Sequence, residues 1–272
     1  MIPKIIHYSW FSTDPMPKHI QELMTTWKKW LPDYELRLWD GKALAEINCT
    51  YANEAVSVKK WAFAADFLRN YVVYKYGGIW LDTDIEVFKS FDPFLHHKMF
   101  IGAEANFHGI PKQRCVTSHV FGAEAGHPFL KLCVNYYMNR HFIHSYCEEL
   151  PWNLRLDCQL ILPEIHCQIL RENFGYNSDG YINPYTEQVL KDDIHVYPYY
   201  YFDSPRYHSM DGVICIHRAQ GGWRSNPNSG KLDFSSTDSK KKSLRYYFLR
   251  IYDTFNAFTY RNWGFGIAKG RR

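Results

Sequence analysis

The 272-residue sequence predicts an α/β fold of Rossmann-like type, with helices around a central mixed sheet whose strands are mainly parallel. Strand-like and helix-like segments alternate from residue 4 to residue 81. At Gly77-Gly78 the apolar period changes from about 3.6 residues to two, as at a helix-to-strand junction. The length suits a single α/β domain with a sizeable core.

The first third of the chain supplies the clearest elements. Residues 4–11 read as a buried strand, and Ser-Thr-Asp-Pro at 12–15 turns the chain out of it. Residues 18–30 carry apolar side chains at helical spacing, and residues 34–39 alternate as a second strand. This order favours parallel strands joined by helices.

Residues 54–76 predict a helix with one apolar stripe. The stripe consists of Val58, Trp61, Ala65, Leu68, Val72 and Tyr76. Asp66 and Arg69 are three residues apart, so they lie one above the other at the edge of the stripe and face a cleft or a partner. Gly77-Gly78 then ends the helix, because glycine adopts the left-handed conformation without steric cost.

An extended segment follows the glycines. Its apolar residues Ile79, Leu81, Ile85 and Val87 alternate with Trp80, Asp82, Asp84 and Glu86. Asp82 and Asp84 are therefore expected on one side, with Cα atoms about 6.6 Å apart. Two carboxylates at this spacing can bind one hard divalent cation, which makes a Mg²⁺ or Mn²⁺ site one interpretation and a polar turn the other. Ligands of such sheets bind at the carboxyl ends of strands, where this pair falls.

Later signals are weaker. They are a strand at 99–103, a returning segment at 115–123 beneath the site, a helix from Pro128 to about 139, an aromatic segment at 194–202 and a short strand at 213–216 that delivers His217. Residues 141–195 show no clear period.

The run W-A-F-A-A-D-F-L-R-N-Y-V-V-Y-K-Y-G-G-I-W-L-D-T-D resembles the DXD-containing region of glycosyltransferase family 32. That family includes capsular polysaccharide enzymes and initiation-specific mannosyltransferases, and the clostridial glucosylating toxins are distant relatives. The segments I-P-K-I-I-H-Y-S-W-F, F-G-A-E-A-G-H-P and H-R-A-Q-G-G-W extend the resemblance over about the first 225 residues. It implies a GT-A-type fold and a nucleotide-sugar donor.

The resemblance also implies roles for individual residues. Asp82 and Asp84 would hold Mn²⁺ or Mg²⁺, with His217 as a further ligand or a structural histidine. Asp66 and Arg69 match the positions that bind sugar hydroxyls, so Asp66, Arg69, Asp82 and Asp84 are the catalytic candidates. The donor-binding candidates beyond these are Tyr8, Trp10, Arg218, Gly222 and Trp223.

Three of these donor-binding assignments have specific grounds. The indole of Trp10 would stack on the base, or lie in the core. A guanidinium such as that of Arg218 presents a planar donor fork to phosphate. The family commonly has His-His before Ser-Trp, whereas Arg218 and Gly222 stand here at the second His and the Ser.

The implied reaction moves a sugar from a UDP- or GDP-sugar to a glycan or lipid-linked saccharide, with retention of configuration. A non-catalytic binder of carbohydrate or nucleotide sugar is the alternative. A Mg²⁺-dependent phosphohydrolase fits less well, because Glu86 stands where its D-x-D-x-T/V signature needs Thr or Val.

Composition bears on location. The seven cysteines form no C-x-x-C pair, there is no apolar run of 18 residues and the start lacks a signal-peptide core, so a cytoplasmic protein is expected.

We divide the chain into a transferase domain at 1–238 and a basic tail at 239–272. The tail carries nine Lys or Arg and one Asp, and its apolar residues recur at helical spacing. It predicts either a packed last helix or a peripheral contact with the cytoplasmic membrane face, and no nucleic-acid motif accompanies it.

Overall fold

The computed structural model describes residues 1–105, 113–138, 140–142, 161–180, 182–205 and 208–218. The helices and strands are, in chain order, β1 (Ile5–Ser9), α1 (Lys18–Trp30), β2 (Glu35–Trp39), α2 (Gly41–Ile47), α3 (Thr50–Ser57), α4 (Trp61–Tyr76), β3 (Gly78–Leu81), β4 (Ile85–Val87), η1 (Asp92–Phe94), β5 (Met99–Ala103), β6 (Val116–Ala123), α5 (Pro128–Met138), α6 (Leu162–Ile169), η4 (Leu170–Phe174), β7 (Gln188–Leu190), η5 (Lys191–Asp193), β8 (Ile194–Tyr197), η6 (Tyr199–Tyr201) and β9 (Cys215–His217). The predicted boundary at residue 238 and the basic tail lie outside the described residues.

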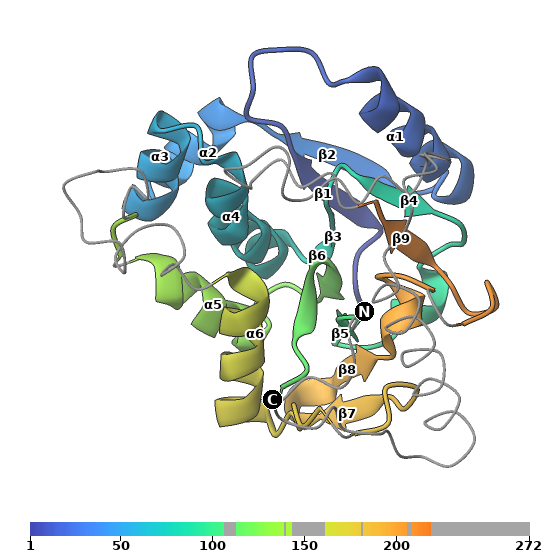
Figure 1. The fold of residues 1–272 in the computed structure, drawn as a ribbon. Coiled ribbons are helices and arrows are strands. Elements are labelled where there is room, and N and C mark those ends of the chain that lie inside the picture. The colour runs from blue at the N-terminus through green and yellow to red at the C-terminus, as the bar shows by residue number, and fades with distance from the viewer. Residues whose placement is uncertain (106–112, 139, 143–160, 181, 206–207, 219–272) are drawn as a thin grey trace, which may run out of the picture.

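A seven-stranded sheet forms the centre of the molecule, in the order β2-β1-β3-β6-β5-β8-β7 (Figure 1). β1 is parallel to β2 and β3, and β5 is parallel to β8, whereas β6 and β7 are antiparallel to their neighbours. Five of the seven strands therefore point in one direction. The predicted α/β fold with a mixed, mainly parallel sheet is confirmed, and this is the architecture expected of a GT-A-type fold. β4 and β9 form a separate two-stranded ribbon.

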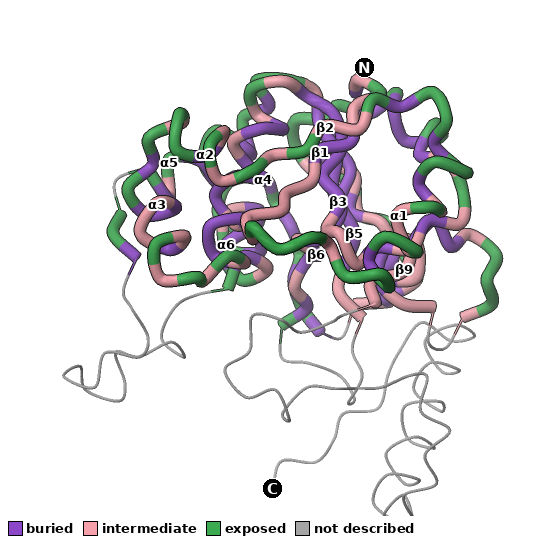
Figure 2. The backbone as a smooth tube through the Cα atoms, turned by 90° about the horizontal axis from the view of Figure 1, so that it is seen from above, coloured by how far each residue is buried: buried purple, intermediate pink, exposed green. Residues whose placement is uncertain are grey.

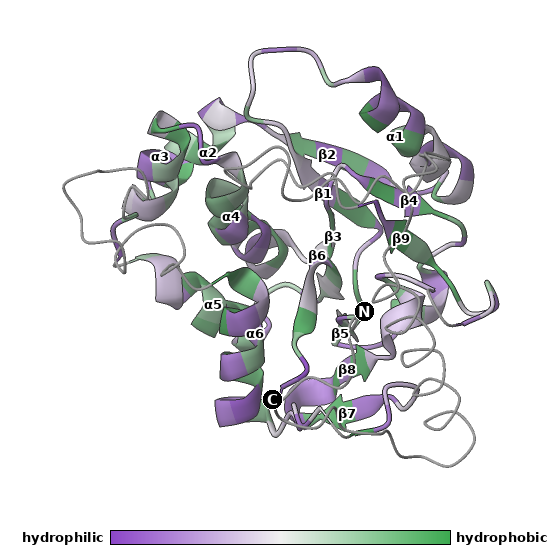
Figure 3. Cartoon of the chain, in the orientation of Figure 1, coloured by the Kyte–Doolittle hydropathy of each residue, from purple (hydrophilic) through white to green (hydrophobic). Residues whose placement is uncertain are grey.

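The sheet separates two apolar cores. Helices α2 to α6 cover one face, while α1 and the β4–β9 ribbon lie on the other (Figure 1). Figure 2 shows buried residues along the central strands and exposed residues on the outer turns of the helices. In Figure 3, α1 and α6 mix hydrophilic and hydrophobic residues, as helices with one face on the sheet should.

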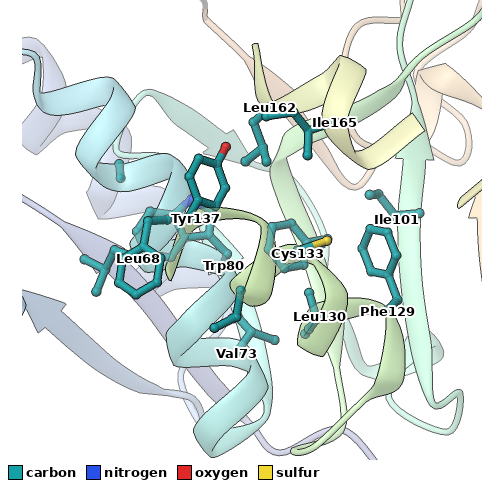
Figure 4. Packing of buried hydrophobic residues seen from close by; sticks show 14 of the residues in the cluster. Leu68, Val73, Trp80, Ile101, Phe129, Leu130, Cys133, Tyr137, Leu162 and Ile165 are labelled. Atoms are coloured by element: carbon teal, nitrogen blue, oxygen red, sulfur yellow. The ribbon is translucent and has the colours of Figure 1, made fainter. Parts of the chain in front are cut away.

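The alternation predicted after Gly78 is present in the packing. Ile79, Leu81, Ile85 and Val87 all lie in the core beside α1, whereas Trp80 packs in the core beside α4 and α5. Figure 4 shows Trp80 near Leu68 and Tyr137 in the core beside α4 and α5. Truncation of a fully buried aromatic side chain of this kind to Ala costs about 3–5 kcal/mol.

The region before β3 differs from the prediction in two details. The expected single helix at 54–76 is two helices, because the chain breaks at 58–60, where Lys59 has a φ of 58°. α4 does end at Gly77, but Gly77 has φ 65° and ψ −177°, which is not the left-handed helical conformation. A positive φ still requires glycine there.

The predicted segments at residues 4–11, 18–30, 34–39, 99–103, 115–123 and 128–139 correspond to β1, α1, β2, β5, β6 and α5, within one or two residues. The prediction did not include α2 and α6. Asp40 caps the N-terminus of α2, because its carboxylate accepts the backbone N–H groups of Lys42 and Ala43. α6 is short and lies in the region without an apolar period.

Candidate active site

The DXD carboxylates lie in a turn between β3 and β4. The backbone N–H of Ile85 donates to the Asp82 carbonyl over 3.1 Å and closes the turn, and the Asp82 N–H donates to the His119 carbonyl on β6 over 3.0 Å. The expectation that an extended strand places Asp82 and Asp84 on one side is therefore wrong. The turn brings the two carboxylates together instead, at the carboxyl end of β3.

The Asp82 carboxylate is held by two neighbours. The indole Nε1–H of Trp80 donates to Oδ1 over 2.7 Å, and Nη1 of Arg69 lies 3.2 Å from Oδ1 and 3.3 Å from Oδ2. Burial raises the pKa of Asp82, although the charge of Arg69 acts to lower it. Asp82 is therefore a buried carboxyl group whose contacts in the protein are Arg69 and Trp80.

Arg69 is the organising cation of the site. Its side chain is 5% exposed, and it contacts Asp66 through Nη2 at 3.2 Å, as the three-residue spacing predicts. It also donates to the carbonyls of Ser118 over 2.6 Å and Ala65 over 3.2 Å. Burial raises the pKa of Asp66 to about 7, against the opposing effect of Arg69. Arg69 thus links α4 to β6 and to the DXD turn.

The β4–β9 ribbon brings His217 to the turn. Ile85 pairs with His217 in antiparallel register, and the His217 Nε2 lies 3.3 Å from Asp84 Oδ1. Burial acts to lower the pKa of His217, but the hydrogen bond and charge of Asp84, with Asp82 and Asp203, raise it to about 9. The predicted short strand before His217 is therefore present, and it delivers the imidazole to the carboxylates.

Of the donor-binding candidates Arg218, Gly222 and Trp223, the structure describes only Arg218. Arg218 pairs with Glu86 through Nε, at 2.7 Å, and through Nη2, and its backbone N–H donates to the Asp84 carbonyl over 3.0 Å. Its phosphate-binding role stays a prediction. Gly222 and Trp223 lie outside the described residues.

Tyr8 and Trp10 lie at the same end of the sheet as the DXD turn, where the parallel strands β1 and β3 end. β1 pairs with β3 in parallel, with His7 opposite Trp80, so the next residues of β1 lie level with Leu81 and the DXD turn. Tyr8 packs edge-on against Trp27, and the Trp10 indole donates to the Asp14 carbonyl over 2.8 Å. Trp10 is partly exposed, so it is not a core residue. Its stacking on a base stays a prediction.

Sequence reasoning missed a second layer behind the DXD turn. The ring of His119 stacks on that of His217 with centroids 4.2 Å apart, and its Nε2 lies 3.1 Å from the Phe202 carbonyl and 3.7 Å from Asp203 Oδ1. Burial lowers the pKa of His119 well below its usual value, so the ring is neutral and Nε2–H donates to Phe202. The polar pair Ser-His inside the apolar run 115–123 was the available signal.

Asp203 and Glu104 belong to the same layer. Asp203 Oδ2 accepts the Ala105 N–H over 2.7 Å, and the Asp203 carbonyl accepts the His217 N–H over 3.0 Å. Burial raises the pKa of Asp203, and it raises that of Glu104 to about 8. Asp203 thereby fixes the backbone that carries His217.

The donor set at the turn fits a divalent cation. Asp82, Asp84 and His217 each offer a ligand atom, and these atoms lie within 4.8 Å of one another. Carboxylate oxygens suit Mg²⁺ and Mn²⁺, and an added imidazole favours the transition metal. The neighbouring carboxylates raise the pKa of His217 to about 9, so its imidazole would have to lose a proton before it could bind a cation.

One family model matches part of the chain. Residues 17–101 match the model of the family described as "Glycosyltransferase sugar-binding region containing DXD motif". The matched segment contains Asp66, Arg69, Asp82 and Asp84.

Two curated yeast relatives resemble about half of the chain. Inositol phosphoceramide mannosyltransferase 3 of Schizosaccharomyces pombe is 29% identical over 52% of this chain and 40% of its own length. The mannosyl phosphorylinositol ceramide synthase SUR1 of Saccharomyces cerevisiae is 26% identical over 47% of this chain and 33% of its own length. The matches thus span less than half of either relative.

Among solved structures, the PaToxG glycosyltransferase aligns with a TM-score of 0.42 and 20% identity, over 63% of this chain and 69% of its own. A glycosyltransferase involved in glycosylation of the major capsid of PBCV-1 aligns with a TM-score of 0.40 and 13% identity, over 78% of this chain and 92% of its own. Residues 17–101 are therefore similar to the sugar-binding region of DXD-containing glycosyltransferases, and about half of the chain is similar to part of two yeast mannosyltransferases.

Proposed function

We propose that this protein is a metal-dependent glycosyltransferase that moves a sugar from a UDP- or GDP-sugar to a glycan or lipid-linked saccharide, with retention of configuration. The observation that carries the proposal is the convergence of Asp82, Asp84 and His217 at the carboxyl end of β3, beside the Asp66–Arg69 pair. An oxygen-rich cation site beside a buried cation–carboxylate pair suits a donor that has both a diphosphate and a polar sugar.

Asp82, Asp84 and His217 would hold Mn²⁺ or Mg²⁺, which when bound neutralises the charge that develops on the leaving nucleoside diphosphate. Two side chains orient the Asp82 carboxylate: Trp80 through its indole N–H and Arg69 through its guanidinium. This fixed orientation lets the carboxylate meet the cation without rearrangement, as preorganised sites require.

The donor's organic groups would bind on either side of the turn. Tyr8 and Trp10 at the end of β1 offer an aromatic surface for the base. Asp66 is the carboxylate available to sugar hydroxyls, and Arg69 holds it in place. Arg218 would contact phosphate only by sharing its guanidinium with Glu86.

Retention needs either a protein nucleophile or a reaction on one face of the sugar. The described carboxylates next to the turn are engaged by Arg69, Trp80 or His217. We therefore favour the second route, in which the acceptor hydroxyl loses its proton to the leaving phosphate. NMR of the anomeric configuration of the first product tests retention directly.

The related yeast proteins, whose names specify mannosyl transfer to inositol phosphoceramide, suggest which substrates to try first. We propose a nucleotide-activated mannose as the first donor and inositol-phosphate lipids as first acceptors, alongside other UDP- and GDP-sugars and saccharide acceptors.

A membrane-linked acceptor would place the enzyme at the cytoplasmic face of a membrane. Within the described ranges, no helix is both long and apolar enough to cross a bilayer. We propose peripheral contact through the basic tail at 239–272 because that segment carries a net charge of +8, from nine Lys or Arg and one Asp.

The deciding experiment measures release of nucleoside diphosphate from the donor panel, with Mn²⁺, with Mg²⁺ and with EDTA. We expect one donor to be turned over, and only with a divalent cation present. Donor binding without turnover would favour a carbohydrate-binding protein, and release of inorganic phosphate from a phosphomonoester would favour a phosphohydrolase.

A further inference from the structure

A second group of metal-ligating side chains lies away from the DXD turn. His97, Asp193 and His195 offer one ligand atom each, and these atoms lie within 4.8 Å of one another. His97 lies two residues before the start of β5, and His195 is the second residue of β8, the parallel neighbour of β5. The group shares no residue with the DXD site.

The pairing register places the two groups at opposite ends of the strands. Ala123 of β6 pairs with both Gly78, the first residue of β3, and Met99, the first residue of β5. His97 therefore lies beyond the starts of these strands, whereas Asp82 follows the end of β3. β8 is also three positions from β3 in the sheet (Figure 1).

Two of the three candidate ligands are oriented by a further polar partner. Asp193 accepts the backbone N–H of Lys98 at Oδ2 over 2.8 Å, and its Oδ1 lies 3.1 Å from His195 Nε2. The other ring nitrogen of His195, Nδ1, contacts the carboxylate of Glu187. Histidines that bind metals in proteins characteristically make such a contact to a carboxylate with the second nitrogen.

The third candidate is held as firmly. The His97 side chain is almost fully buried, and its Nε2 lies 2.9 Å from the Tyr197 hydroxyl. Its ring stacks on that of His195 with centroids 3.6 Å apart. The two imidazoles are thus fixed side by side before any ligand arrives, and the Asp193 side chain, 42% exposed, opens the group to solvent.

We propose that His97, Asp193 and His195 form a second cation site, selective for Zn²⁺ or a similar transition metal. Two imidazoles and one carboxylate form a typical zinc ligand set, whereas Mg²⁺ and Mn²⁺ favour oxygen ligands. Zn²⁺ would bind the deprotonated Nε2 of His195, so a proton carried by that nitrogen would leave to solvent on binding. The cation joins the start of β5 to the turn before β8, so it stabilises this part of the sheet. This proposal does not depend on the transferase reaction.

The test is Zn²⁺ titration calorimetry on the full chain carrying Asp84→Asn, which weakens the DXD site. We expect one Zn²⁺ per chain at this group and a Zn²⁺-dependent rise in thermal midpoint. Both should be lost or weakened at least about tenfold in His195→Gln and Asp193→Asn, more than the loss of an orienting residue alone typically causes. Asn tolerates the positive φ of 57° at position 193, so that variant should fold.

His141→Gln is the matched control. His141 is an exposed histidine that also contacts a carboxylate, that of Glu54, but it belongs to no three-residue group. Its variant should bind Zn²⁺ as the parent does. If Zn²⁺ affinity is the same in the parent and in both site variants, or falls equally in the control, the group is a hydrogen-bonded cluster and the proposal is wrong. Visible absorption of bound Co²⁺ provides a second readout of nitrogen ligation.

Discussion

At the residue scale, the candidate site depends on how one buried guanidinium distributes its contacts. Arg69 contacts Asp66 and Asp82 and donates to the carbonyls of Ala65 and Ser118. A lysine cannot make these contacts together, because it has one nitrogen and no planar fork. The Asp66 and Asp82 carboxylates are thus oriented by a residue that is itself almost fully buried.

We expect Asp84→Ala to abolish sugar transfer while the fold stays intact. Loss of one group that stabilises transition-state charge typically costs about 3 kcal/mol or more, which is about a 10²-fold fall in rate. Donor turnover with Mn²⁺ supplied checks the rate, and circular dichroism checks the fold. Asp33→Asn removes an exposed carboxylate outside the site and should have no effect. Unchanged turnover in Asp84→Ala would contradict the assignment.

We also expect Trp10→Ala and Asp66→Ala to separate base binding from sugar binding. Trp10→Ala should weaken the binding of free nucleoside diphosphate, because an aromatic surface at the end of β1 is lost. Asp66→Ala should spare that binding and reduce transfer, because Asp66 is assigned to the sugar. Calorimetry with the free nucleotide, followed by transfer assays, checks both. The reverse pattern would show that the two assignments are wrong.

His7 predicts a loss of stability in mild acid. Its Nε2–H donates to the Gly77 carbonyl over 2.8 Å, and its Nδ1 accepts the Trp39 indole N–H over 3.1 Å, so the folded protein holds the ring neutral. Burial lowers the pKa of His7 to about 4 from 6.5. The unfolded chain therefore binds a proton that the folded chain does not between these values. The stability contributed by neutral His7 is complete above pH 6.5 and falls as the pH drops toward 4, by up to about 3 kcal/mol.

Urea unfolding at pH 7 and pH 5 measures this effect. His166 has its pKa lowered to about 3 by burial, so it acts in the same direction. The comparison is therefore between the parent and His7→Gln, which should lose less stability between the two pH values. His19→Gln, which replaces an exposed histidine, should lose as much as the parent. Equal losses in all three would exclude a role for His7.

At the element scale, the junction of α4 with β3 depends on two glycines. Gly78 has a φ of 106°, and a Cβ there would lie 2.7 Å from the Ile5 carbonyl oxygen on β1. This close approach keeps β1 and β3 in the pairing that aligns Tyr8 and Trp10 with the DXD turn. The helix, the glycines and the strand thus act together to place the site at the carboxyl end of β3.

We expect Gly78→Ala to destabilise the fold by at least about 1–3 kcal/mol, because the backbone conformation is strained for alanine and the new methyl group meets the Ile5 backbone. Gly41→Ala is the matched control, since a Cβ at Gly41 has no neighbour within 4 Å and position 41 begins α2. Its stability should be unchanged or up to about 1 kcal/mol higher. Thermal and urea unfolding of the two variants decide, and equal stabilities would contradict the argument.

At the scale of the whole molecule, the basic tail sets the charge distribution. Residues 239–272 carry +8, so residues 1–238 carry −4 of the net +4. Because the tail lies outside the described residues, its role stays a prediction drawn from its aromatic helical period and its cations. A packed last helix and an interfacial helix are the two alternatives.

We expect the full chain to co-sediment with anionic liposomes and a chain ending at Asp238 to do so less. Cations near anionic lipid contribute about 1 kcal/mol each, so the difference should shrink with added salt and vanish with neutral lipid. Equal sedimentation of the two chains would favour the packed helix.

Local patterns were sufficient for much of this molecule. Apolar periods and runs predicted β1, α1, β2, β5 and α5 within one or two residues, because such patterns involve residues close together in the chain. The spacing of Asp66 and Arg69, the position of the DXD carboxylates after β3 and the delivery of His217 by a short strand were also readable from the sequence. The first two features involve residues close together in the chain, for which spacing determines proximity, whereas the meeting of His217 with Asp84 depends on the fold.

Only the tertiary structure decided which distant residues meet. The DXD carboxylates are brought together by a turn and not by strand alternation, the helix at 54–76 is broken at Lys59, and Arg218 pairs with Glu86. His119 and Asp203 join His217 from other strands and loops, as His97 joins His195 across parallel strands. Such contacts depend on strand order and register, which arise from the packing of both sheet faces. No local period encodes them, because the residues involved are separated by as many as 132 positions in the chain.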